Sequence, residues 1–231
     1  MRISTRLRAG VALLPITVLG LVACVPTPPV PPTTTTTTTV PTPPAVLSVG
    51  HVDIGLAVEN GEFEPHVHDE ENDAEYAPDE AILTALPGTA TTVPSDSAYS
   101  FLGAPGATTY VLPQTQDPAL LWLGIGAEEI EAGVLVDDQF DMSITAVDGP
   151  GTFAMYTVDG LGVPTVLVDS TDGLPDTLAG LASGIHTHVN YAFSEPGTYE
   201  VSLRFTGTLA DGNVALDSGP VTYTFDVQAA P

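Results

Sequence analysis

The sequence predicts an all-β fold, an antiparallel β-sandwich of immunoglobulin-like or jelly-roll-like type, over residues 47–231. Short segments alternate between apolar and polar residues, as half-buried strands do. Turn signals rich in glycine, proline and aspartate separate these segments at short intervals. No long segment has the 3.6-residue apolar period of an amphipathic helix. Short strands joined by turns are typical of sandwiches and barrels, and of these we expect a sandwich.

Residues 1–23 are predicted to be a bacterial lipoprotein signal peptide. Arginines at positions 2, 6 and 8 precede an apolar run at 9–23, which is short for a transmembrane helix. The run ends in small residues before Cys24, the only cysteine of the chain. This resemblance implies cleavage before Cys24 and a diacylglyceryl lipid on its sulfur. We therefore expect a lipid-anchored protein at the extracellular face of the cell membrane; the alternative is an ordinary signal peptide with an incidental cysteine.

Residues 24–46 are predicted to form a disordered linker between the lipid and the folded domain. After Cys24 the chain is almost wholly proline, threonine and valine, with threonine at every position from 33 to 39. Such a composition cannot bury a core. Proline-rich chains extend by about 3.1 Å per residue, so this linker would hold the domain some tens of ångströms from the membrane.

Within the domain, the alternation of apolar and polar residues is clearest in two segments. Val201, Leu203 and Phe205 alternate with polar residues, and residues 221–227 repeat this pattern. Pro196-Gly197-Thr198-Tyr199 precedes the first of these segments and is typical of the corner at which immunoglobulin-like sheets turn. Further strands are expected at 49–58, 108–113, 119–125, 139–147, 152–158, 163–169 and 188–193.

The chain is strongly acidic, which excludes nucleic acid as a partner. Its 29 aspartates and glutamates face four lysines and arginines, giving a formal net charge of −25. Arg204 is the only basic side chain outside the predicted signal peptide. The domain therefore cannot neutralise phosphates, whereas its negative field attracts divalent cations. Alternatively, the acidity serves only the solubility of an exported protein or reflects a salty habitat.

All five histidines lie in three short motifs: His51-Val52-Asp53, His66-Val67-His68 and His186-Thr187-His188. Residues i and i+2 of a strand point to the same face, so each motif aims two possible metal ligands at one point.

The first and third motifs are predicted to lie on the polar faces of strands. Alternating apolar residues at 52–58 leave His51 and Asp53 on the opposite face, and those at 189–193 leave His186, His188 and Asn190 together. Neighbouring strands lie about 4.8 Å apart, close enough for four ligands to share one ion. We expect His51, Asp53, His186 and His188 to be metal ligands, and Asn190 to orient one of them.

His66 and His68 are second candidates for metal ligands. Residues 64–73 are too polar for a core strand, so we expect a loop that closes over the site or hangs free. The predicted ion is zinc (Zn²⁺), with Cu²⁺ and Mn²⁺ as alternatives. Imidazoles and a carboxylate suit these ions, and the domain has no thiolate for softer ones.

A set of further motifs runs along nearly the whole domain. They are Gly50-His51-Val52-Asp53, residues 101–106, 111–114 and 121–124, Gly149-Pro150-Gly151, residues 186–193 and residues 196–199. Together they resemble the actinobacterial surface-anchored proteins with the "choice-of-anchor M" domain, whose repeat ends in a His-x-His motif. That family usually has tryptophan where this chain has Tyr191. The resemblance implies attachment to the cell envelope and, because some members are encoded beside metal-type ABC transporters, metal handling with transporter components as partners.

The leading interpretation is a cell-envelope lipoprotein that binds a transition metal and is not an enzyme. A second is a surface display or adhesion module whose histidines support folding or an interface. A third is a copper/zinc metalloenzyme, because His66-Val67-His68 is similar to a segment of the copper–zinc superoxide dismutases. The domain lacks that family's disulfide cysteines, and Arg204 lies in an ordinary alternating strand.

Overall fold

The computed structural model describes residues 43–231, which form an all-β, sandwich-like fold. The predicted signal peptide, Cys24 and the linker up to residue 42 lie outside the described residues. The first strand, β1 (Ala45–Leu47), starts slightly before the predicted beginning of the domain. In the part of the chain that the structure describes, no helix has the length and apolar character needed to cross a membrane.

Residues 43–231 form three sheets, named here by one strand of each. The strand order of the β15 sheet is β1, β5 (Ala81–Ala85), β17 (Val221–Val227), β15 (Gly197–Leu209), β9 (Leu135–Asp148) and β12 (Asp176–Ala182), with β16 (Ala215–Asp217) paired to β15. The β10 sheet has the order β11 (Pro164–Asp169), β10 (Phe153–Val158), β14 (Asn190–Phe193), β7 (Thr108–Leu112) and β6 (Ala90–Thr92). The β2 sheet has the order β13 (His186–His188), β8 (Leu121–Gly126), β2 (Gly50–Glu59), β3 (Glu62–Asp69) and β4 (Ala74–Tyr76). Three short 3₁₀ helices, η1 (Pro78–Glu80), η2 (Pro87–Thr89) and η3 (Ser97–Leu102), lie in the connections.

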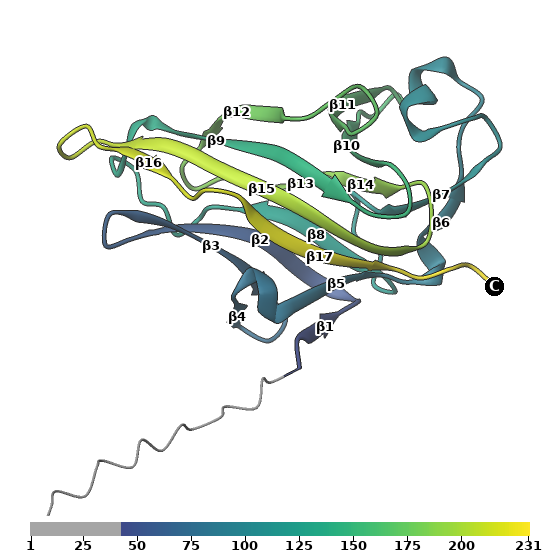
Figure 1. The fold of residues 1–231 in the computed structure, drawn as a ribbon, viewed down its shortest axis with the longest axis horizontal. Coiled ribbons are helices and arrows are strands. Elements are labelled where there is room, and N and C mark those ends of the chain that lie inside the picture. Colours follow the sequence, from purple (N-terminus) through teal and green to yellow (C-terminus); the bar gives the residue numbers. More distant parts are fainter. Residues whose placement is uncertain (1–42) are drawn as a thin grey trace, which may run out of the picture. The chain divides into compact units, whose positions relative to one another are not determined.

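The β15 sheet packs against both other sheets, and one continuous apolar core fills the space between them. Its strands β9, β15 and β17 run side by side across the molecule (Figure 1). Phe140 of β9 meets Phe63 of the β2 sheet, with ring centroids 6.5 Å apart. Phe225 of β17 meets Phe153 and Phe193 of the β10 sheet at 6.3 and 5.2 Å. The inner face of the β2 sheet is therefore fixed by the core, and its outer face is left for polar side chains.

The predicted all-β, sandwich-like fold is confirmed, but its sheets are not antiparallel throughout. The pairs β1–β5, β5–β17 and β2–β8 are parallel, so two of the three sheets are mixed. The alternation of apolar and polar residues specifies which face of a strand is buried, but it contains no information about the direction of the neighbouring strand.

Two local predictions were wrong. The segment expected as one strand at 188–193 is divided between β13 and β14, which belong to different sheets, and the chain crosses between them at Val189. Much of the segment expected as a loop at 64–73 belongs to β3. Phe63 and Val67 lie on the inner face of β3 and are buried in the core. The outer face of β3 is polar because it lies outside the core.

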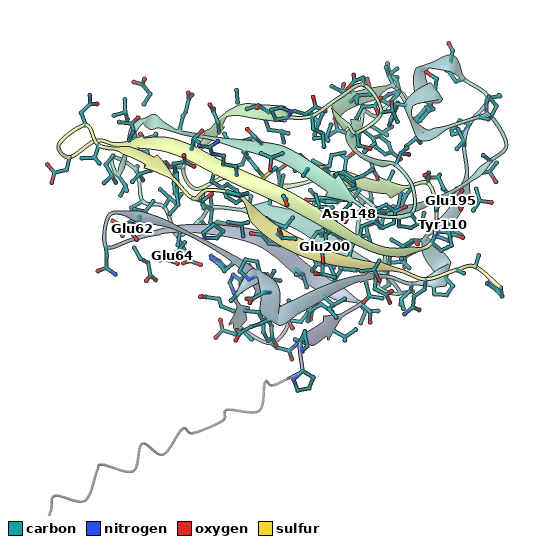
Figure 2. All side chains as sticks on the ribbon, in the orientation of Figure 1. Glu62, Glu64, Tyr110, Asp148, Glu195 and Glu200 are labelled. Atoms are coloured by element: carbon teal, nitrogen blue, oxygen red, sulfur yellow. The ribbon has the colours of Figure 1, made fainter. Side chains whose placement is uncertain are left out.

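The predicted corner at Tyr199 is present. The Tyr199 hydroxyl donates a hydrogen bond to the backbone oxygen of Glu195 at 2.8 Å; Glu195 is labelled in Figure 2. The ring lies against Gly149, where a Cβ atom would be only 2.3 Å from a Tyr199 ring carbon. The Gly149-Pro150-Gly151 motif thus has a structural explanation, because only glycine fits beside this ring.

Candidate metal centre

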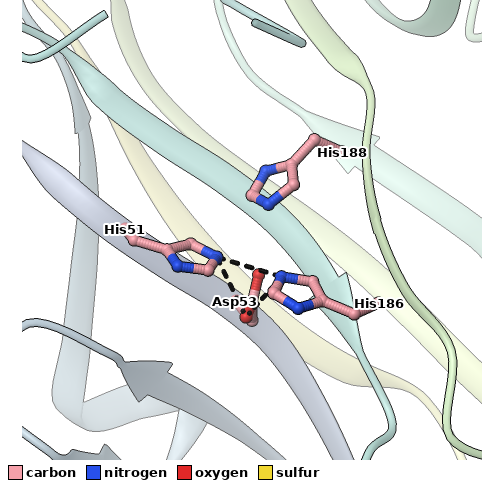
Figure 3. A group of neighbouring side chains, drawn as sticks. All are labelled: His51, Asp53, His186 and His188. Carbon is pink, nitrogen blue, oxygen red and sulfur yellow. Dashed lines mark hydrogen bonds and ion pairs between the residues drawn. The ribbon is translucent and has the colours of Figure 1, made fainter. Parts of the chain in front are cut away.

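The structure brings together four of the predicted ligands. His51 and Asp53 project from β2, and His186 and His188 project from β13 (Figure 3). One potential ligand atom from each of the four lies within 4.8 Å of the others. The group could therefore hold a metal ion.

The two strands that supply these residues are not neighbours, because β8 lies between them. Asp53 and His188 are both paired in register with Gly124 of β8. A Cβ atom on Gly124 would lie 2.0 Å from Asp53 Oδ1 and 2.9 Å from His188 Cε1. The missing side chain provides the space in which the two residues approach each other across β8. The sequence analysis did not identify this role of Gly124. The available signal was the pair Gly124 and Gly126, which share one face of β8 and are paired in register with His188 and His186.

Two of the three distances among His51, Asp53 and His186 match those of a tetrahedral site. His51 Nε2 lies 3.0 Å from His186 Nε2. Asp53 Oδ2 lies 3.4 Å from the first nitrogen and 3.3 Å from the second. Tetrahedral zinc, with bonds of about 2.0–2.1 Å, separates its ligand atoms by roughly 3.3–3.4 Å. Three ligand atoms are thus already spaced much like one face of a zinc tetrahedron.

The orientation of His186 is fixed by Glu128, a residue that sequence reasoning did not identify. His186 Nδ1 lies 2.7 Å from Glu128 Oε1. A hydrogen on Nδ1 donated to this carboxylate leaves Nε2 as the free lone pair, directed toward His51 and Asp53. Metal-binding histidines commonly have a carboxylate in this position.

His188 is held by packing against an aromatic ring. Its imidazole stacks on Trp122, with centroids 3.6 Å apart and an angle of 5° between the planes. Neither ring nitrogen has a hydrogen-bond partner among residues 43–231. Burial, assisted by nearby His51, lowers the pKa of His188 to about 4. The ring is therefore neutral at pH 7, which is the form that binds metals.

Asp53 is a buried carboxylate with little to neutralise it. Its exposed fraction is 1%, and neither oxygen has a hydrogen-bond partner in the described part of the chain. Burial raises the pKa of Asp53, and the neighbouring His186 and His51 partly offset this rise. The only lysine or arginine in residues 43–231, Arg204, is bound to Asp217. Once Asp53 is ionised, its charge can therefore be balanced from this part of the chain only by histidine protons, and otherwise by a bound cation.

The remaining predicted residues lie outside this group. His66 and His68 of β3 form a separate group with Glu129, which sequence reasoning did not identify. Asn190 lies in the β10 sheet, where its side chain accepts a hydrogen bond from Gln114 N at 2.9 Å and donates one to Tyr156 O at 3.2 Å. The prediction that Asn190 orients a ligand is not supported, because the change of sheet at Val189 commits its amide to other partners.

Comparison with protein-family models, curated proteins and solved structures finds no match for the chain. The resemblance to the choice-of-anchor M domain therefore stays a prediction based on the sequence motifs.

Proposed function

We propose that this protein is a cell-envelope lipoprotein that binds a transition-metal ion, with zinc preferred, through His51, Asp53, His186 and His188. The observation that carries the proposal is the position of Asp53. A buried carboxylate that has no hydrogen-bond partner among residues 43–231 faces two imidazole nitrogens at 3.3–3.4 Å. A divalent cation between them would satisfy all three groups.

The composition of the donor set supports zinc. Three imidazoles and one carboxylate fill the four positions that zinc prefers. Cu²⁺ and Mn²⁺ remain the alternatives, although Cu²⁺ favours square-planar or tetragonal sites and Mn²⁺ favours oxygen-rich octahedral ones. Four protein ligands would leave no open position on tetrahedral zinc, whereas catalytic zinc sites keep one open. This favours binding or delivery of the ion over an enzymatic role.

The sequence supports the location of this activity. A lipid on Cys24 would anchor the chain to the outer face of the membrane, and the proline- and threonine-rich linker would hold the metal centre away from the bilayer. Components of a metal-type ABC transporter are the proposed partners, as the family resemblance implies.

A surface display module with structural histidines is the second candidate. The distance of 3.0 Å between the Nε2 atoms of His51 and His186 is that of an ordinary hydrogen bond, so the pair can be stable without an ion. In that case, substitution of the histidines would change stability or partner binding without any dependence on metal.

Metal analysis of the purified chain without a histidine tag distinguishes the two candidates. We expect the protein, stripped with a chelator and dialysed against zinc, to retain at least one equivalent and to gain thermal stability. The double variant His51→Ala/His186→Ala should lose the most tightly bound equivalent of zinc. Thr187→Ala, which changes the neighbour of His186 on β13, should keep it. The proposal is overturned if neither stoichiometric binding nor a thermal shift occurs with zinc, copper or manganese.

A further inference from the structure

A second group of metal-binding side chains lies on the same face of the β2 sheet. His68 is paired in register with Asp53, and His66 with Gly55, on the neighbouring strands β3 and β2. Glu129 approaches from the connection after β8. One potential ligand atom from each of His66, His68 and Glu129 lies within 4.8 Å of the other two. This group shares no residue with the first.

The geometry around His66 is that of a histidine prepared to bind a cation. Its Nδ1 donates a hydrogen bond to the backbone oxygen of Glu64 at 3.1 Å, which leaves the Nε2 lone pair free. Nε2 lies 3.4 Å from Glu129 Oε1, again the separation of two ligands on one zinc ion. A Cβ atom at Gly55 would be 2.2 Å from His66 Nε2, so glycine at this position makes room for the ring.

All three residues of the second group and Asp53 of the first border one pocket with a volume of about 190 Å³. Four carboxylates line it, and no lysine or arginine does so in the described part of the chain; the carboxylates belong to Asp53, Glu70, Glu128 and Glu129. Like charges this close repel one another in a partly buried space. One divalent ion at the first site would offset half of this charge, and two divalent ions would offset all of it.

We propose that His66, His68 and Glu129 bind a second divalent transition-metal ion, across the pocket from the first site. The second site has no buried carboxylate: the exposed fraction of its Glu129 side chain is 43%, against 2% for Asp53 of the first site. It also has three protein ligands instead of four, which leaves a coordination position open. The second ion is therefore bound more weakly and exchanges faster than the first.

The surface around the second site is suited to attract cations. Glu62 and Glu64 lie on the same face of β3 as His66 and His68, because all four alternate along the strand (Figure 2). His66 also borders a second hollow, whose lining includes the carboxylates of Glu59, Glu64, Glu75 and Glu129. Acidic side chains thus surround His66 on both sides, and their field raises the local cation concentration.

Titration of the chelator-treated protein with Zn²⁺, followed by native mass spectrometry and calorimetry, tests the second site. We expect two equivalents, the second weaker than the first by roughly tenfold or more, the order of effect expected for loss of one metal-binding interaction. Glu129→Gln should weaken the second equivalent by roughly tenfold and leave the first unchanged. Glu62→Gln removes the same charge from the same face without removing a ligand, so its effect should stay below about twofold.

The outcomes separate this inference from the proposed function. His66→Ala/His68→Ala should retain only the tight equivalent, and His186→Ala/His188→Ala should retain only the weak one. A second equivalent that persists without the first would support the second site even if the proposed function fails. The inference is overturned if Glu129→Gln and His66→Ala/His68→Ala both leave every zinc equivalent of the wild-type protein unchanged.

Discussion

At the scale of single residues, the carboxylate of Asp53 is unfavourable in the metal-free protein. It is buried, its pKa is raised by burial, and it lacks hydrogen bonds within residues 43–231. The folded state binds the Asp53 proton more tightly than the unfolded state does. The stability that this provides is present below the unfolded pKa of 3.8 and is lost as pH rises through the raised pKa. Above the raised pKa, the ionised group therefore opposes folding.

Replacing Asp53 with asparagine should consequently stabilise the metal-free protein while removing its response to zinc. We expect a gain in the free energy of unfolding on the order of 1 kcal/mol at pH 7, because the variant no longer buries an unpaired charge. Urea denaturation with and without zinc measures both effects. A metal-free Asp53→Asn protein less stable than wild type would show that the carboxylate has a structural role in the absence of metal.

His188 predicts a different pH dependence. Its pKa is about 4 in the folded protein and 6.5 in the unfolded chain. Between these values, as pH falls, the unfolded chain takes up a proton that the folded protein does not, so the free energy of unfolding decreases. The loss should reach about 2 kcal/mol by pH 4, allowing for partial exposure of the ring.

Substitution of His188 by phenylalanine keeps an aromatic ring beside Trp122 but removes the titration. In the metal-free state, the difference in unfolding free energy between wild type and His188→Phe should therefore change between pH 6.5 and pH 4 in favour of the variant. Parallel pH profiles for the two proteins in chemical denaturation would contradict the assigned pKa.

At the scale of elements, strand β8 makes the site possible by presenting glycine where β2 and β13 direct their side chains. Gly124→Ala should place a methyl group against Asp53 and His188, costing about 1–3 kcal/mol of stability and abolishing zinc binding at the first site. Gly160→Ala is the matched control, because a Cβ atom there meets no described atom within 4 Å. Thermal unfolding and zinc titration of both variants provide the measurement. Normal zinc affinity in Gly124→Ala would show that the gap over β8 is not required.

The strands that sequence alternation identified are those with one face in the core. For β2, β15 and β17, the alternating apolar residues were sufficient to predict a strand and its buried face. Strand β3 was missed because its outer face has Glu62, Glu64, His66 and His68, so its average polarity resembles that of a loop. The same polarity marks it as a candidate binding surface. A polar segment with period-two alternation can therefore be a strand whose exposed face binds a ligand.

The site itself was predictable only in part. Spacing of two along each strand was enough to group His51 with Asp53 and His186 with His188. The contributions of Gly124, Glu128 and Glu129 depend on the pairing of β8 between β2 and β13, a long-range contact without a local sequence signal. The hydrogen bonds of Asn190 were likewise unpredictable, because they depend on the change of sheet at Val189.

At the scale of the whole molecule, the residues that stabilise the fold and the candidate metal ligands lie on opposite faces of the β2 sheet. The core between the β15 sheet and the two smaller sheets is built from apolar residues of all three. Both histidine groups lie on the outer face of the β2 sheet, opposite the core residues Val52, Ile54 and Val67. Polar substitutions on this outer face leave the packed side of each strand unchanged. The protein can therefore support a dense set of carboxylates that would be incompatible with an apolar core.

The same charge distribution predicts how metal binding depends on salt. With a net charge of −25, the chain attracts divalent cations over a distance comparable to the Debye length, which shrinks from about 30 Å at 0.01 M salt to about 3 Å at 1 M. The association rate of Co²⁺, used as a spectroscopic substitute for zinc, should fall roughly tenfold over this range in stopped-flow measurements. Dissociation from the first site should change little, because the buried Asp53 is poorly screened by salt. If association were insensitive to salt while dissociation accelerated, the acidic surface would not steer the ion, and affinity would depend on exposed ligands instead.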